Sequence, residues 1–300
     1  DPGARYAWLQ RQEAAAWRLA QRQRQIEVLR ELVEASKGRP ERDTYVLDLF
    51  RNDFSYGSQA RAMELADRAV ADTSIGLHMR ALIGLVQTEY WKQLQDRIRT
   101  ERAWSTAQSL QRQALASPGP VPAHYLRSMG SIAESAVAHM RGDRNTSIEH
   151  LRESSRRAKA WMDERAAFHK PPAAPDAQWL QAWTVRDWAQ GLAIWELAAL
   201  GRFAEAAAIC DSGLARARES GSTTFIAQWS YRSAHAQLQL RQYERAQKHA
   251  AEAESLLASF GASRASRQSW LARETRILAL VGQRRWAEAD DSYNEFLASI

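Results

Sequence analysis

Small and apolar residues recur along this chain at the spacing of one face of an α-helix. In the stretch 187–214, DWAQGLAIWELAALGRFAEAAAICDSGL, a turn at Gly201-Arg202 separates two such segments. The second segment carries Ala206, Cys210 and Gly213 at steps of four and three residues, which places them on one helical face. Because these side chains are small, another helix can approach closely, and the stretch predicts an antiparallel helix pair.

The same spacing occurs six times along the chain. The six triplets are Ala62-Ala66-Ala69, Ala103-Ala107-Leu110, Ser147-Leu151-Ser154, Ala206-Cys210-Gly213, Ala246-Ala250-Ala253 and Ala289-Tyr293-Phe296. Their first residues lie 41, 44, 59, 40 and 43 positions apart. A single helix pair cannot bury its own apolar face, so repeats of this length are typical of a solenoid in which each pair stacks on its neighbours.

Three of the triplets follow an aromatic residue that lies three positions earlier, at Phe203, Tyr243 and Trp286. The segment Gly-Arg-Phe-Ala-Glu-Ala and its two later counterparts resemble the tetratricopeptide repeat (TPR). The resemblance is good over 183–300 and degenerate before that. It implies an all-α, right-handed superhelical solenoid of antiparallel helix pairs. The intervals exceed the family's usual repeat of about 34 residues, so we expect longer helices or longer connections.

Glycine and proline divide the chain into four predicted segments. These are a long N-terminal helix in 1–40, degenerate helical repeats in 41–166, a proline-rich loop in 167–176 and TPR-like repeats in 177–300. The first helix is expected over 4–36, with a wholly polar middle, and ends before Gly38 and Pro40. A short helix over 44–51 and a turn at 54–57 should follow it.

Composition narrows the classes of partner. The net charge is +6, but the arginines are interspersed with 35 acidic residues, which is typical of solvated helix faces rather than of a nucleic-acid surface. No apolar run approaches the length that would cross a bilayer, so we expect a soluble chain without membrane insertion. The single cysteine excludes an internal disulfide, and the compartment, cytoplasmic or periplasmic, stays open.

The motif search predicts a protein that is not an enzyme and needs no cofactor. The sequence has no glycine-rich phosphate loop, no G-x-S-x-G, no H-E-x-x-H and no C-x-x-C. Cys210 lies on a small-residue helical face, which favours an inert core thiol over a nucleophile. The seven histidines are dispersed, so no metal site is expected. An α/α-toroid enzyme, with tryptophans that stack on sugars, is a rival interpretation, but no carboxylate pair accompanies a glycine-rich loop.

Twelve tryptophans are the unusual feature of the composition. If Ala206 is the twentieth residue of a TPR unit, several residues fall at the second, fifth and ninth positions, which line the concave groove in that family. These residues are Trp188, Trp195, Gln228, Tyr231, His235 and Glu274. The resemblance therefore implies a groove that binds a protein or a peptide, since aromatic anchors dominate such surfaces. Packing inside the solenoid is the alternative interpretation for the large aromatic residues.

The sequence stops at Ile300, directly after a predicted second helix. Tyr293, Phe296 and Leu297 would then be partly uncovered, whereas solenoids usually end in a polar capping helix. We expect the chain to continue, and the array resembles the sensory repeats that precede effector domains in bacterial proteins, such as CHAT proteases. This makes a regulatory region an alternative function. Self-association through this end or through the N-terminal helix is the other expectation.

Overall fold

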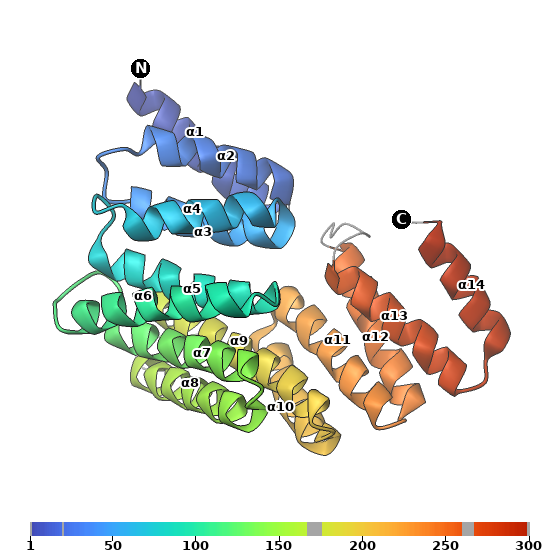
Figure 1. The fold of residues 1–300 in the computed structure, drawn as a ribbon. Coiled ribbons are helices and arrows are strands. Elements are labelled where there is room, and N and C mark those ends of the chain that lie inside the picture. The colour runs from blue at the N-terminus through green and yellow to red at the C-terminus, as the bar shows by residue number, and fades with distance from the viewer. Residues whose placement is uncertain (1, 20, 167–175, 260–266, 299–300) are drawn as a thin grey trace. The chain divides into compact units, whose positions relative to one another are not determined.

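The computed structural model describes residues 2–19, 21–166, 176–259 and 267–298. Within these ranges the regular structure is α-helical, with fourteen helices and no strand (Figure 1). The chain divides into two compact units, Asp1–Ala189 and Gln190–Ile300. One helix, α9 (Ala177–Ala199), crosses the boundary between them. None of the helices in the described ranges combines the length and the apolar character needed to cross a membrane.

Unit 1 contains four helix pairs and the first half of α9. Its helices are α1 (Pro2–Arg18), α2 (Arg22–Ala35), α3 (Arg42–Tyr56), α4 (Gln59–Ala71), α5 (Leu77–Gln93), α6 (Arg97–Leu115), α7 (Ala123–Met140) and α8 (Arg144–Arg165). Unit 2 contains the second half of α9 and five further helices. They are α10 (Phe203–Ser220), α11 (Thr223–Gln239), α12 (Tyr243–Ser259), α13 (Arg267–Gly282) and α14 (Trp286–Leu297).

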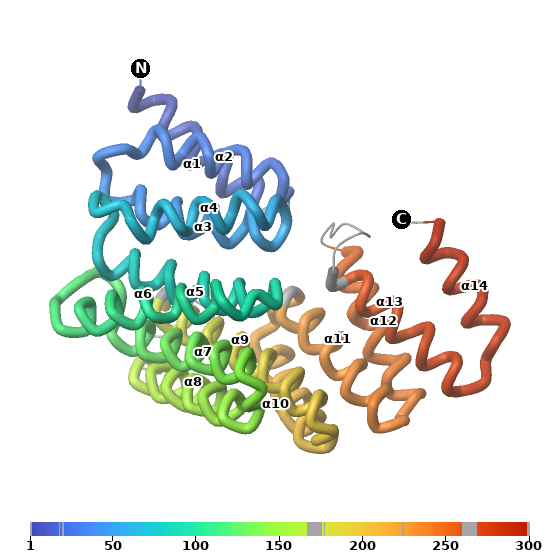
Figure 2. Tube along the Cα trace, in the orientation of Figure 1, coloured from blue at the N-terminus to red at the C-terminus, as the bar shows by residue number. Residues whose placement is uncertain are grey.

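Consecutive helices pack against one another from α1 to α8 and from α10 to α14, as expected for a solenoid. Within unit 1, α5 contacts α6, α6 contacts α7, and α5 also contacts α7 directly. Unit 2 repeats this arrangement with α11, α12 and α13. Figure 2 shows the chain reversing between consecutive helices of each unit. The prediction of an all-α solenoid of helix pairs is therefore confirmed, and the odd-numbered helices α3, α5 and α7, and likewise α11 and α13, form rows of adjacent helices.

Five helix pairs share one turn conformation. The residue that reverses the chain has a positive φ in each pair, at Gln95, Gly142, Gly201, Arg241 and Arg284, with values between 57° and 84°. In every case the next helix begins two residues later. The left-handed conformation satisfies carbonyl groups at the end of the first helix and turns the chain back on itself. The recurrence of this turn shows that the degenerate pairs of unit 1 and the TPR-like pairs of unit 2 share one local design.

The prediction of one long N-terminal helix is wrong. The predicted helix over 4–36 is two helices, α1 and α2, which pack against each other. Leu9 and Leu29 are fully buried, and the side chain of Gln25, in the polar segment, is 3% exposed and donates to Glu13 at 2.7 Å. A single straight helix would leave these apolar faces in water, so a break after Arg18 lets the two halves cover one another.

Two further segments of unit 1 differ from what the sequence predicts or are only partly described. The short helix expected over 44–51 continues to Tyr56, so Phe54 is not part of a turn but is buried within α3. The expected proline-rich loop lies outside the described residues except for Asp176. That carboxylate accepts from the backbone N–H of Trp179 at 2.9 Å and pairs with Arg165, and so it caps the start of α9. The sequence also predicts a turn at Ser263-Arg264, and this segment lies outside the described residues.

The small-residue faces are buried in most of the predicted triplets. Ala206, Cys210 and Gly213 all face the interior, and Gly213 lies so close to Trp229 of α11 that a Cβ atom there would be 2.3 Å from the indole ring. The exception is the last triplet. Only Ala289 of α14 is buried, whereas Tyr293 is 47% exposed, because no later helix among the described residues packs on that face.

Candidate functional site

The predicted groove residues of unit 2 lie on α9, α11 and α13, and all are half-buried. Gln228, Tyr231 and His235 share one face of α11 because they are spaced three and four residues apart. The imidazole ring of His235 lies 4.7 Å, centroid to centroid, from the indole ring of Trp195 on α9. The structure therefore brings Trp195 and His235 together, with Tyr231 one turn away from His235.

Close packing between α9 and α11 holds this arrangement. The guanidinium of Arg232 lies 4.8 Å from the centroid of the Trp229 ring and 6.0 Å from that of Tyr231. A Cβ atom on Gly191 would be 2.7 Å from the guanidinium carbon of Arg232, so the absence of a side chain at Gly191 leaves room for the guanidinium in its present position. The guanidinium of Arg232 thus lies between Gly191 of α9 and the aromatic rings of α11.

Burial changes the charge state available at this surface. It lowers the pKa of His235, because the positive form loses hydration. The imidazole is therefore neutral at pH 7 and offers one donor and one acceptor nitrogen. Glu274 is half-buried on α13, and within the described ranges no hydrogen bond joins it to the other predicted residues. Glu274 thus lies on α13, which packs against α11, but no hydrogen bond joins it to Trp195 or His235.

Trp188 belongs to unit 1, where it extends a cluster of aromatic rings. The indole centroid of Trp188 lies 6.4 Å from the ring of Tyr90 on α5. Tyr90 in turn stacks on Phe54 of α3, with centroids 3.8 Å apart and planes 13° apart, and contacts Phe50 at 5.2 Å. Sequence reasoning missed Tyr90 as the partner of Trp188, and the two phenylalanines that pack on Tyr90, because the repeat pattern is degenerate in this part of the chain.

A charged group lies beside this aromatic cluster. Arg51 of α3 donates from Nη2 to the hydroxyl of Tyr125 on α7 at 2.9 Å. Asp48 lies one helical turn before Arg51, and burial raises the pKa of its carboxyl group to about 6, although Arg51 acts in the opposite direction. A contact between residues 74 positions apart has no local signal, and no motif in the sequence pointed to it.

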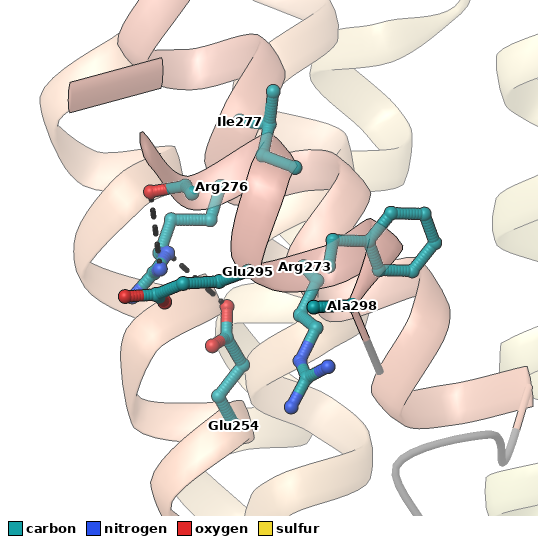
Figure 3. Close-up of a pocket in the computed structure, with 8 residues that line it drawn as sticks. Glu254, Arg273, Arg276, Ile277, Glu295 and Ala298 are labelled. Carbon is teal, nitrogen blue, oxygen red and sulfur yellow. Dashed lines mark hydrogen bonds and ion pairs between the residues drawn. The ribbon is translucent and has the colours of Figure 1, made fainter. Parts of the chain in front are cut away.

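Unit 2 also has a pocket of about 460 Å³ between α12, α13 and α14. Figure 3 shows charged side chains of both signs around it: Glu254, Arg273, Arg276 and Glu295. Arg276 lies 3.4 Å from a carboxylate oxygen of Glu254 and donates to the hydroxyl of Ser292 at 3.2 Å. Two arginines face two glutamates, so the lining is balanced in charge.

Cys210 has the environment expected of a core thiol. Its side chain is fully buried, and burial raises the pKa of the thiol to about 12. The prediction of a packed thiol is confirmed, since a nucleophilic cysteine needs a lowered pKa. Among the described residues, no three histidine, cysteine or acidic side chains gather in a way that could hold a metal ion.

Comparison with known proteins finds similar solved structures. No family model matches the chain, and no curated protein matches it. Among solved structures, the chain is similar to the apo form of RapI, with a TM-score of 0.38 and 11% sequence identity. The alignment covers 85% of this chain and 75% of RapI.

Proposed function

We propose that this chain is a non-catalytic helical-repeat scaffold that binds a protein or a peptide on the face formed by α11, α13 and the second half of α9 in unit 2. The observation that carries the proposal is the Trp195–His235 pair on α9 and α11. Both rings are half-buried and lie 4.7 Å apart, with Gln228 and Tyr231 on the same face of α11. This combination offers apolar ring surface next to neutral hydrogen-bonding groups.

The chemistry of this surface suits a peptide. A half-buried tryptophan has already lost part of its conformational freedom, so a ligand that covers the rest of the ring incurs little additional entropy cost. The amide of Gln228 and the neutral imidazole of His235 can each donate and accept, as backbone amides of a peptide require. Because aromatic anchors contribute most of the free energy at such interfaces, we expect Trp195 and Tyr231 to dominate binding.

The test is a selection of peptides against the whole chain, followed by measurement of dissociation constants for the variants. We expect Trp195→Ala and Tyr231→Ala each to weaken a selected peptide by about 30-fold or more, which is the range of a hot-spot residue. Trp286→Ala is the matched control, because Trp286 is 61% exposed on α14 and lies outside the proposed surface.

Circular dichroism and thermal unfolding of each variant separate loss of binding from loss of structure. If the selected peptides bind the three variants as tightly as the parent chain, the proposed surface is wrong. The same conclusion follows if Trp286→Ala is the variant that loses binding.

A further inference from the structure

The pocket between α12, α13 and α14 has a lining that is unusual for a small-molecule site. Its volume of about 460 Å³ lies within the range of such sites, which are mostly lined by apolar side chains with a few polar groups. Here charged side chains of both signs dominate. They come from all three helices: Glu254 on α12, Arg273 and Arg276 on α13, and Glu295 on α14 (Figure 3). A ligand that fits this lining carries charge itself.

The repeat pattern shows that the fold does not require these charges. Glu254 lies eight residues after the first residue of one small-residue triplet, and Arg276 lies 13 residues before the first residue of the next. At the same two positions the preceding repeat has Leu214 and Ser233, which are 4% and 0% exposed. That part of the solenoid is therefore built without ions. Two ions at such positions lose hydration, which destabilises the chain unless they are fully paired.

The charges in the pocket are only partly paired with one another. Arg276 donates from Nη2 to Ser292 at 3.2 Å, and its Nε lies 3.4 Å from Oε1 of Glu254. These last two atoms are shielded from solvent, yet neither has a hydrogen-bond partner within the described ranges. Glu295 forms neither a hydrogen bond nor an ion pair with any other residue that the structure describes. The pocket thus holds carboxylate oxygens that could accept from a ligand.

The electrostatics of Glu254 indicate which charge the ligand brings to these oxygens. Burial raises the pKa of the Glu254 carboxyl group, Arg276 and Arg273 act in the opposite direction, and Glu295 adds to the rise. The pKa stays above its ordinary value, so the two arginines do not offset the loss of hydration and the repulsion by Glu295. A further cation between the two carboxylates would offset both.

We infer that this pocket binds a free α-amino acid with an apolar side chain. Its ammonium group lies between Glu254 and Glu295 and supplies the donors that these carboxylates lack. Its carboxylate pairs with the guanidinium of Arg273, because two N–H donors of a guanidinium match the two oxygens of a carboxylate. Since two acidic and two basic residues line the pocket, a ligand with one charge of each sign preserves the balance of charge.

The rest of the lining accounts for an apolar side chain on the ligand. Ile277 and Phe296 are half-buried and line the pocket beside the charged groups. The ring of Phe296 lies 6.2 Å, centroid to centroid, from the ring of Trp270. A ligand side chain that covers this surface gains free energy by burying apolar area. None of the lining residues belongs to the predicted peptide groove, so this site is separate from the surface in the proposed function.

Fluorinated amino acids test the inference with the whole chain. Two zwitterions, 4-fluorophenylalanine and 5,5,5-trifluoroleucine, represent aromatic and aliphatic side chains. Each is compared with its amide, which keeps only the ammonium group, and with its N-acetyl derivative, which keeps only the carboxylate. Fluorine NMR at pH 6.5 gives the dissociation constants. At least one zwitterion should bind, and both of its derivatives should bind about 10-fold or more weakly, since each lacks one set of hydrogen bonds to a charged group.

Matched variants locate the site. Glu295→Gln removes a carboxylate of the pocket, whereas Glu288→Gln removes one from an exposed position of the same helix outside the pocket. Glu295→Gln should weaken the zwitterion by about 10-fold, and Glu288→Gln should leave its affinity unchanged. Arg273→Gln should weaken the zwitterion by a similar factor but change the affinity of the amide little, because the amide has no carboxylate. Circular dichroism checks that each variant is folded.

The inference is overturned if neither zwitterion binds at millimolar concentration, or if the amide or the N-acetyl derivative binds as tightly as its parent. It is also overturned if Glu295→Gln and Glu288→Gln have the same effect. The comparison of the derivatives uses the parent chain and so holds even if a variant does not fold. Failure of this test is distinguishable from failure of the proposed function, because the latter is measured with selected peptides and with Trp195 and Tyr231.

Discussion

The contact between Gly213 and Trp229 gives a sharp test of the small-residue face. Replacement of Gly213 by alanine adds one methyl group in the middle of α10. A Cβ atom at this position would lie 2.3 Å from two carbons of the Trp229 ring, which is 1% exposed. Nonbonded carbon atoms rest about 3.5–4.0 Å apart, so the indole or the two helices must move by more than about 1 Å.

Two effects of opposite sign determine how much Gly213→Ala changes the free energy of unfolding. Glycine in a helix interior is about 1 kcal/mol less favourable than alanine, so helix propensity alone predicts that Gly213→Ala stabilises the chain. Overpacking of a close-packed core costs about 1–3 kcal/mol. Because Trp229 is 1% exposed and the guanidinium of Arg232 lies 4.8 Å from its ring centroid, little free space is open to the indole. We therefore expect a net destabilisation of about 1–2 kcal/mol at the upper end of the overpacking range.

Urea unfolding followed by circular dichroism measures this difference. With a slope of about 2 kcal/mol per molar urea, the midpoint of unit 2 should fall by about 0.5–1 M. Ser212→Ala, at an exposed position of the same helix, is the control for helix propensity and should change the midpoint little. The double variant Gly213→Ala/Trp229→Phe should lose less stability than the two single changes together, because the smaller ring makes room for the methyl group.

A Gly213→Ala variant that is stabilised by about 1 kcal/mol, as propensity alone requires, would refute this reasoning. The same holds if the effects of Gly213→Ala and Trp229→Phe simply add. Either result would mean that α10 and α11 are not in the close contact that the small-residue face implies.

Three other measurements test the buried titratable groups. Cys210, with a thiol pKa of about 12 and full burial, should not react with an aromatic disulfide reagent at pH 8 until urea unfolds unit 2; complete labelling within minutes of mixing would contradict its core position. The pKa of Asp48 is raised to about 6, so the folded chain holds a proton that the unfolded chain releases near pH 4, and stability is lost as the pH rises from 4 to 6. Asp48→Asn should therefore raise the unfolding free energy by about 1–3 kcal/mol at pH 7.5 and by much less at pH 4. An equal effect at both pH values would contradict this prediction. His235 has a lowered pKa, so its contribution to the unfolding free energy is present above pH 6.5 and lost on acidification. His235→Gln should reduce the fall in unfolding free energy between pH 7 and pH 5. An unchanged fall would exclude this role for His235.

The sequence predicted features that depend on residues close together in the chain, and it missed features that depend on contacts between distant residues. Helix ends near Gly201 and Phe203 were predicted because turn and helix signals lie within a few residues. The extension of α3 to Tyr56 was not, since Phe54 is held in the helix by stacking on Tyr90, 36 positions later. In the candidate site, the spacing on α11 indicated that Gln228, Tyr231 and His235 share a face, but not which residues of α9 they meet.

The sequence by itself determined the all-α solenoid, the repeated small-residue faces and the inert environment of Cys210. Each of these follows from periodicity within one helix, where the 3.6-residue repeat fixes which side chains lie together. Only the tertiary structure decided that the first forty residues fold back as a helix pair, and that Arg51 meets Tyr125 beside the aromatic rings around Tyr90. These features depend on how separate helices stack, and stacking is governed by the burial of whole faces rather than by any local pattern.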